Sequence, residues 1–239
     1  MKVVNDLLGY KNLKIVQDTD YFSFSLDSVL LPNFVTISRN TKNILDIGTG
    51  NAPIPMILNY KYNIPIVAFE IQKEIYELAC ETLKLNNLSE KIRIVNDDIK
   101  NISKYYDYES FDVIVSNPPY FKNQNLSKKN DNLIKAIARH ELKLNLDDII
   151  RIAYKYLKND GVLSMVYRTE RLTDVLTLMR QNKIEPKRIL FIYPKEGKKS
   201  NLFLIEGIKN GNYGIKEVQK LIVHDQDGNY TADVIKYFS

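Results

Sequence analysis

From about residue 43 onward, the chain alternates short runs of apolar, β-branched residues with stretches of helical periodicity. The first run, Asn43 to Ile47, leads into a glycine turn. After the turn come Pro53 and Pro55, which are well tolerated in the first turn of a helix. Strands that alternate with helices pair in parallel, with the helices covering both faces of the sheet. The alternation therefore predicts an α/β fold with a doubly wound, mostly parallel sheet.

The same alternation predicts most of the remaining elements. Further strands are predicted at 64–69, 92–95, 111–116, 162–167, 188–193 and 201–208. Helices are predicted at 73–85, 146–157 and 169–181. Asn159-Asp160-Gly161 is predicted to stop the second of these helices, and the polar stretch 122–132 to form a mobile loop.

No linker or internal repeat divides the sequence, which predicts one domain over residues 1–239. Within it, 43–208 is predicted as the catalytic core. Residues 1–42 are expected to pack over the mouth of the sheet, and 209–239 to form a C-terminal extension with a turn and a short helix.

The composition is that of an ordinary globular protein, with 44% hydrophobic and 26% charged residues. The net charge of +5 suits a polyanionic partner, although an A/T-rich coding sequence also enriches lysine. Cys80 is the only cysteine, so no intrachain disulfide is expected, and the two histidines give no metal-ligand pattern. The sequence has no signal-peptide profile and no apolar run of about 20 residues, which predicts a cytoplasmic protein without a membrane partner.

The glycine turn reads Asp46-Ile47-Gly48-Thr49-Gly50 and closes the first strand of the core. Glycines let a ligand approach the backbone closely at the carboxyl edge of the sheet, where open α/β folds bind their ligands. Glu70 ends the next strand, where a carboxylate can accept hydrogen bonds from both hydroxyls of a ribose. The third glycine of the dinucleotide fingerprint is missing, which disfavours a nicotinamide cofactor.

Two adjacent acids, Asp97 and Asp98, follow the predicted strand 92–95. A carboxylate at this place can accept a hydrogen bond from the exocyclic amine of an adenine ring. Asp98 is the better candidate because it stands immediately before Ile99. Acids after a strand also serve as turn and capping residues, so both interpretations stay open.

The sharpest motif is Asn117-Pro118-Pro119-Tyr120, directly after the predicted strand 111–116. The prolines stiffen the turn, so the Asn117 side-chain oxygen and the Pro118 carbonyl can both accept from one planar –NH2 group. Such contacts orient the nitrogen lone pair and offset the positive charge that develops during transfer. Tyr120 offers a face on which a planar base or amide can stack. The motif therefore indicates chemistry at an amide or exocyclic amine nitrogen.

Together, the glycine turn, Glu70, Asp98 and 117–120 resemble the class I amino-methyltransferases over about residues 43–167. The resemblance implies S-adenosylmethionine as cofactor and a seven-stranded sheet with an antiparallel strand near one edge. It also implies that Asp46, Gly48 and Gly50 surround the methionine part of the cofactor, Glu70 the ribose and Asp98 the adenine.

Three subclasses of this family act on adenine in DNA, on glutamine in proteins and on adenine in RNA. The chain leaves little room for a target-recognition domain or for a helical domain before the glycine turn, which favours a compact RNA enzyme. Segments 22–31, 138–141 and 227–231 resemble bacterial tRNA adenine-N6 methyltransferases that modify the adenine just 3′ of the anticodon in a valine tRNA. These enzymes usually have acidic residues after the Tyr-Thr pair at 230–231, and here Ala232-Asp233 only partly keeps them. A catalytically inactive RNA-binding module remains the non-enzymatic alternative.

Other residues carry weaker signals. Asp27 begins a predicted helix, where it either caps the helix or reaches the amino group of the cofactor. Arg139, beside the polar stretch, and the trio Lys195, Lys198 and Lys199 suit contacts with RNA phosphates. A basic run of this kind is also found on any solvated face.

Overall fold

The computed structural model describes residues 1–19, 25–118 and 144–238. Its strands are β1 (Lys2–Leu7), β2 (Tyr10–Asp18), β3 (Ile44–Ile47), β4 (Ile66–Phe69), β5 (Ile92–Val95), β6 (Phe111–Ser116), β7 (Leu157–Arg168), β8 (Ile184–Lys195), β9 (Leu202–Lys209) and β10 (Glu217–His224). Its α-helices are α1 (Asp27–Phe34), α2 (Pro53–Tyr62), α3 (Lys73–Leu85), α5 (Leu146–Tyr156), α6 (Leu172–Gln181) and α7 (Ala232–Ile235). Short 3-10 helices are η1 (Ile99–Lys104), η2 (Thr169–Arg171) and η3 (Lys236–Phe238). The predicted mobile loop, Pro119, Tyr120 and Arg139 lie outside the described residues.

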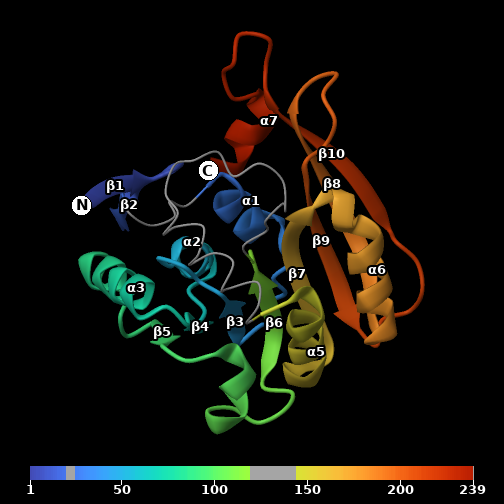
Figure 1. Ribbon diagram of the computed structural model, residues 1–239, viewed down its shortest axis with the longest axis horizontal. Coiled ribbons are helices and arrows are strands. Elements are labelled where there is room, and N and C mark those ends of the chain that lie inside the picture. Colours follow the sequence, from blue (N-terminus) through green and yellow to red (C-terminus); the bar gives the residue numbers. More distant parts are fainter. Residues whose placement is uncertain (20–24, 119–143, 239) are drawn as a thin grey trace, which may run out of the picture.

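Among the described residues, the main sheet has eight strands in the order β5-β4-β3-β6-β7-β9-β8-β10 (Figure 1). All neighbouring pairs are parallel except those that β9 makes with β7 and β8. Seven of these strands give the predicted arrangement, with an antiparallel strand near one edge. The eighth, β10, extends the sheet alongside β8 and was not predicted as a strand of this sheet.

Side chains of the central strands alternate between two hydrophobic clusters, one on each face of the sheet. On β3, Ile44 belongs to the cluster beneath α1, α2 and α3, whereas Leu45 belongs to the cluster beneath α5 and α6. On β6, Val113 and Ile114 divide between the clusters in the same way. Strands buried on both faces need such apolar runs, and this is why the sequence predicted them well.

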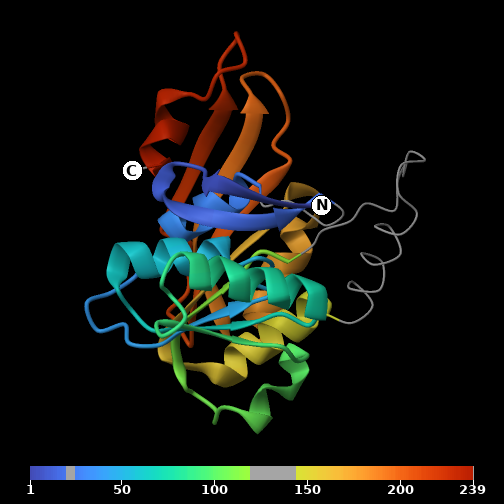
Figure 2. The same cartoon turned by 90° about the vertical axis from the view of Figure 1, so that its left-hand side faces the viewer.

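The N-terminal residues form a separate hairpin, β1–β2, that packs on α2 and α3 (Figure 2). The polar groups of β2 that face these elements are satisfied by buried side chains. The Asn51 amide donates to the Val16 carbonyl over 3.0 Å, and the Val16 N–H donates to the Thr82 hydroxyl over 3.0 Å. Because Asn51 directly follows the glycine turn, the hairpin is tied to the mouth of the sheet.

The C-terminal end of α1 is held by strands from the other end of the chain. The buried Glu206 carboxylate on β9 accepts hydrogen bonds from the Thr36 N–H (2.6 Å) and hydroxyl (2.8 Å). Arg188 on β8 donates to the Phe34 carbonyl over 3.0 Å and lies over the Phe34 ring. One hydrophobic cluster accordingly includes residues from all three predicted segments, from Leu7 to Val234. The division into one domain with these bounds stays a prediction.

The prediction for Asn159-Asp160-Gly161 was wrong. Helix α5 ends at Tyr156, and the three residues lie inside β7 as an irregularity in its pairing with β6. Register changes there from Phe111 opposite Leu157 to Val113 opposite Val162, and Asp160 adopts a left-handed φ of 60°. Asn and Gly therefore mark an interruption of a strand here instead of the end of a helix.

None of the described helices is long and apolar enough to span a membrane.

Candidate active site

Three strand ends meet at one edge of the sheet and define the candidate site. Ile47, the last residue of β3, lies opposite Phe69 on β4 and Ser116 on β6. The N–H groups of Gly48 and Thr49 both donate to the Phe69 carbonyl over 3.0 Å. The Ser116 hydroxyl donates to the Ile47 carbonyl over 2.9 Å, a contact that the sequence did not predict. The glycine turn, Glu70 and Asn117 therefore leave the sheet at the same level.

Asp46 is fully buried at the end of β3, and neither of its carboxylate oxygens has a hydrogen-bond partner among the described residues. Burial raises the pKa of Asp46 to about 7, and the negative charge of Glu70 adds to this effect. The nearby Thr49 hydroxyl offsets part of the rise without reaching hydrogen-bond geometry. A buried carboxyl without a partner is costly, so the site favours a ligand that brings hydrogen-bond donors or positive charge to Asp46.

The glycine turn is open on its ligand side. Gly48 and Gly50 have φ of 74° and 60°, and a Cβ atom at either position would meet nothing within 4 Å. Glu70 lies beside this turn, where one carboxylate oxygen accepts the Gly50 N–H over 3.1 Å and the other accepts the Gln72 N–H over 2.9 Å. Burial raises the pKa of Glu70 to about 7. The turn and Glu70 thus form one cradle, and their cofactor contacts stay a prediction.

The two acids after β5 have different roles in the structure. Asp97 accepts hydrogen bonds from the Asn101 amide (2.7 Å) and the Tyr105 hydroxyl (2.9 Å), so its carboxylate stabilises the local turn. Asp98 caps η1 by accepting the Lys100 N–H over 3.0 Å and is half-buried. Asn96, which sequence reasoning missed, donates to the Glu70 carbonyl over 2.8 Å and joins this turn to the cradle.

Asn117 follows β6, and its side chain contacts the first residues of α1. Its amide nitrogen lies 3.3 Å from a carboxylate oxygen of Asp27 and 3.2 Å from the Ser28 hydroxyl. Pro118 is buried beside it. The structure thus brings Asp27 to Asn117, and the cofactor contact expected of Asp27 stays a prediction. Ser28 was given no role from the sequence, although it lies in segment 22–31, which carries part of the resemblance.

The residues present suit a nucleoside cofactor that carries a cationic group. Asp46 and Thr49 present buried polar atoms without partners in the described part of the chain, directly beside an open glycine cradle and the Glu70 carboxylate. No group of three or more potential metal ligands occurs among the described residues. The strand order and this edge are those of class I methyltransferases, which use S-adenosylmethionine.

Comparison with known proteins identifies the family to which this methyltransferase belongs. The model of the methyltransferase small domain family matches residues 13–182. A protein of Trichodesmium erythraeum named tRNA1(Val) (adenine(37)-N6)-methyltransferase is 31% identical over 191 residues, covering 74% of this chain and 76% of the relative. A protein with the same name from Actinobacillus pleuropneumoniae is 26% identical and covers 93% and 91%. The chain belongs to the methyltransferase small domain family, and it is an S-adenosylmethionine-dependent enzyme.

Solved structures agree on the fold. A predicted O-methyltransferase from Agrobacterium tumefaciens aligns with a TM-score of 0.70 at 20% identity, covering 89% of this chain and 96% of that one. Geranyl diphosphate C-methyltransferase from Streptomyces coelicolor, solved with S-adenosyl-L-homocysteine, aligns with a TM-score of 0.56 at 9% identity, covering 77% and 76%. The sheet and its connections are therefore those of a methyltransferase.

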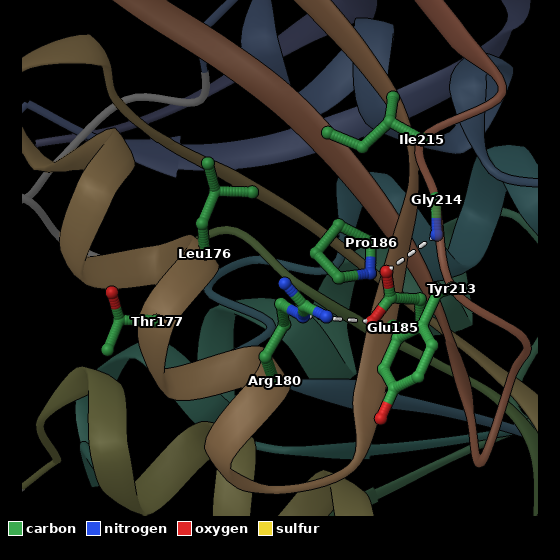
Figure 3. Close-up of a pocket in the computed structure, with 8 residues that line it drawn as sticks. All are labelled: Leu176, Thr177, Arg180, Glu185, Pro186, Tyr213, Gly214 and Ile215. Atoms are coloured by element: carbon green, nitrogen blue, oxygen red, sulfur yellow. Dashed lines mark hydrogen bonds and ion pairs between the residues drawn. The ribbon is translucent and has the colours of Figure 1, made fainter.

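A separate pocket of about 550 Å³ lies away from this edge, between α6, the start of β8 and residues 213–215 (Figure 3). Its charged groups already interact with one another. Arg180 pairs with Glu185 at 3.2 Å and lies over the Tyr213 ring, while Glu185 also accepts the Gly214 N–H over 2.9 Å. Because β8 begins here, the pocket is at the amino edge of the sheet, opposite the candidate site.

The basic trio Lys195, Lys198 and Lys199 lies at the turn between β8 and β9, where Lys198 and Lys199 are exposed. Strands β7 and β8 run in the same direction, since β9 is antiparallel to both. The turn is therefore on the same edge of the sheet as Asn117. Strands in a sheet are about 4.8 Å apart, and four steps separate β3 from β8, so the trio is displaced sideways from the glycine turn by roughly 20 Å.

Proposed function

We propose that this enzyme methylates the N6 amino group of an adenine in tRNA, namely adenine 37, just 3′ of the anticodon of a valine tRNA. The relatives that cover most of the chain carry this activity in their names. The single observation that carries the proposal is the position of Asn117, one residue beyond Ser116 and level with the glycine turn. An amide oxygen there is suited to accept from an exocyclic amine beside a bound cofactor.

Asp46, Gly48, Gly50, Glu70 and Asp98 are proposed to hold the cofactor, and Asp27 contacts Asn117. When bound, S-adenosylmethionine supplies an electrophilic methyl group. Buried carboxyls at Asp46 and Glu70 match the ammonium and the ribose hydroxyls of such a molecule.

The acceptor side is proposed to consist of the Asn117 side-chain oxygen, the Pro118 carbonyl and the Tyr120 ring, with Pro119 stiffening the turn. Two acceptors on one –NH2 group fix its plane and direct its lone pair. They also stabilise the positive charge that grows on nitrogen, and the proton leaves after the transfer. No strong general base is required.

An adenine reaches this position only when it is turned out of its stack. Loop bases are easier to extrude than paired bases, and RNA is commonly recognised in such loops. Lys195, Lys198, Lys199 and Arg139 are proposed to contact phosphates. The separation of roughly 20 Å between the lysine turn and the glycine turn suits a macromolecule far better than a free nucleotide. A tRNA substrate also implies a cytoplasmic location.

The test is methylation of a valine tRNA transcript, followed by mass spectrometry of its nucleosides. N6-methyladenosine should form at position 37, and the transcript with guanine at that position should not react. Asn117→Ala should bind S-adenosylmethionine as the wild type does, yet turn over roughly 100- to 1000-fold more slowly, by analogy with the loss of one oxyanion-hole donor. Methylation of a release-factor glutamine or of duplex DNA in parallel reactions, with none on tRNA, would contradict the proposal. Binding of tRNA without any methyl transfer would instead indicate an inactive module.

A further inference from the structure

We infer that Asp27 and Ser28 are positioning residues for Asn117, because they engage its amide nitrogen and so turn its amide oxygen toward the target amine. The inference rests on the proposed function, in which Asn117 accepts a hydrogen bond from the substrate. It assigns to the start of α1 a role in methyl transfer itself.

The argument begins with the asparagine side chain. Its two ends have nearly the same shape but opposite hydrogen-bonding capacity, since the oxygen only accepts and the –NH2 only donates. An exocyclic amine offers donors to Asn117. If the amide were flipped, donors would face donors and the contact would be repulsive. Catalysis therefore needs a device that fixes which end of the amide points toward the substrate.

Asp27 is suited to be this device, because an ionised carboxylate accepts hydrogen bonds and does not donate them. One of its oxygens lies 3.3 Å from the Asn117 nitrogen, and the other accepts from the Ser25 hydroxyl. Ser28, whose hydroxyl is 3.2 Å from the same nitrogen, can both donate and accept and would tolerate either orientation. Asp27 therefore sets the orientation, and Ser28 reinforces it.

The two residues are also well placed to hold Asn117 firmly. Asp27 and Ser28 are only 8% and 7% exposed, and a contact with a charged group is stronger when water is excluded. The other end of α1 is fixed by Glu206 and Arg188 through Thr36 and Phe34. The helix is thus anchored at its C-terminal end while its first turn holds the catalytic amide.

The test is a double-mutant cycle of Asp27→Asn and Asn117→Ala, with kcat, KM and S-adenosylmethionine affinity measured for each variant. Asp27→Asn should lower kcat by about tenfold, the scale of one charge-assisted hydrogen bond, with affinity and KM unchanged. In the Asn117→Ala background the same substitution should have no further effect. Ser28→Ala should lower kcat by less, because Asp27 still fixes the amide.

The matched control is Asp147→Asn, which removes an acid from the first turn of α5 that pairs with Arg151 and not with Asn117. It should leave kcat unchanged and controls for the loss of a charge near a helix N-terminus. An equal loss from Asp27→Asn in both backgrounds would overturn the inference. So would weaker cofactor binding at constant kcat, which would make Asp27 a cofactor contact.

A readout without substrate separates this inference from the proposed function. In NMR spectra, the side-chain –NH2 signals of Asn117, identified by their loss in Asn117→Ala, should exchange slowly with solvent in the wild type. Asp27→Asn should accelerate this exchange, whereas Asp147→Asn should not. Fast exchange in the wild type would overturn the inference even if tRNA is methylated. Slow exchange in a protein that methylates no tRNA would refute only the proposed function.

Discussion

Replacing Asp46 with asparagine should change how the stability of the ligand-free protein depends on pH. Burial raises the pKa of Asp46 from its ordinary value of 3.8 to about 7. Between these values the folded protein holds a proton that the unfolded chain has released. The free energy of unfolding of the wild type therefore falls as the pH rises from about 4 to about 7, and this contribution is absent above pH 7. An asparagine does not titrate, so the variant lacks this fall.

The magnitude follows from the same two pKa values. From pH 5 to about pH 7 the folded wild type keeps a proton that the unfolded chain has released, and these two pH units correspond to about 2.5 kcal/mol of lost stability. The asparagine amide leaves its own donors buried, at a cost of about 1–3 kcal/mol that is the same at every pH. The free energy of unfolding of the variant minus that of the wild type should thus rise by about 2.5 kcal/mol from pH 5 to pH 8. Burial also raises the pKa of Glu70, but Glu70 is present in both proteins.

Urea denaturation of both proteins at pH 5, 6, 7 and 8 measures this difference. Calorimetry at pH 8 should also show that the variant binds S-adenosylmethionine more weakly, because the cationic group of the cofactor loses an ionised partner. A stability difference that stays constant from pH 5 to pH 8 would refute the assignment of a buried, proton-holding Asp46. Unchanged cofactor affinity would refute its placement in the cofactor site.

Three further results are expected. Glu70→Ala should weaken S-adenosylmethionine binding in calorimetry, since the ribose acceptor is lost; unchanged affinity would rule out this placement of the ribose. Lys198→Glu with Lys199→Glu should weaken tRNA binding and reduce its salt dependence in filter-binding assays while sparing the cofactor, and equal weakening of both would contradict a phosphate role. Glu206→Ala should lower the free energy of unfolding by about 3 kcal/mol, because it removes a buried carboxylate together with its two hydrogen bonds from Thr36, whereas the more exposed Glu217→Ala should cost less than about 1 kcal/mol.

The core of the fold was predictable because its strands are buried on both faces and read as apolar runs. The predicted strand 111–116 and helix 73–85 agree with the structure to the residue. The hairpin β1–β2 was not predicted, since part of its surface is polar and its β2 backbone is satisfied by Asn51 and Thr82 from distant elements. Such tertiary contacts leave no periodic trace in the sequence.

The proximity of the glycine turn and Glu70 was predictable because each follows one of two neighbouring parallel strands. The glycine turn and Glu70 are adjacent in the structure as expected, with Glu70 hydrogen-bonded to Gly50. The contact between Asp27 and Asn117 joins residues 90 positions apart, and only the fold brings them together. The phosphate contacts proposed for Lys198 remain a prediction, because exposure alone does not distinguish a binding surface from a solvated one.

The hydrogen bonds from Thr36 to Glu206 also have a consequence for the synthesis of the protein. The two partners are 170 residues apart, so the ribosome synthesises the first roughly 10 to 35 s before the second at ordinary elongation rates. The glycine turn and its flanking strands are completed well before that interval ends, while α1 still lacks its anchor. We therefore expect nascent chains that stop before β9 to have a loosely held Asn117 and no useful turnover. The enzyme thus becomes competent only as its last strands are completed.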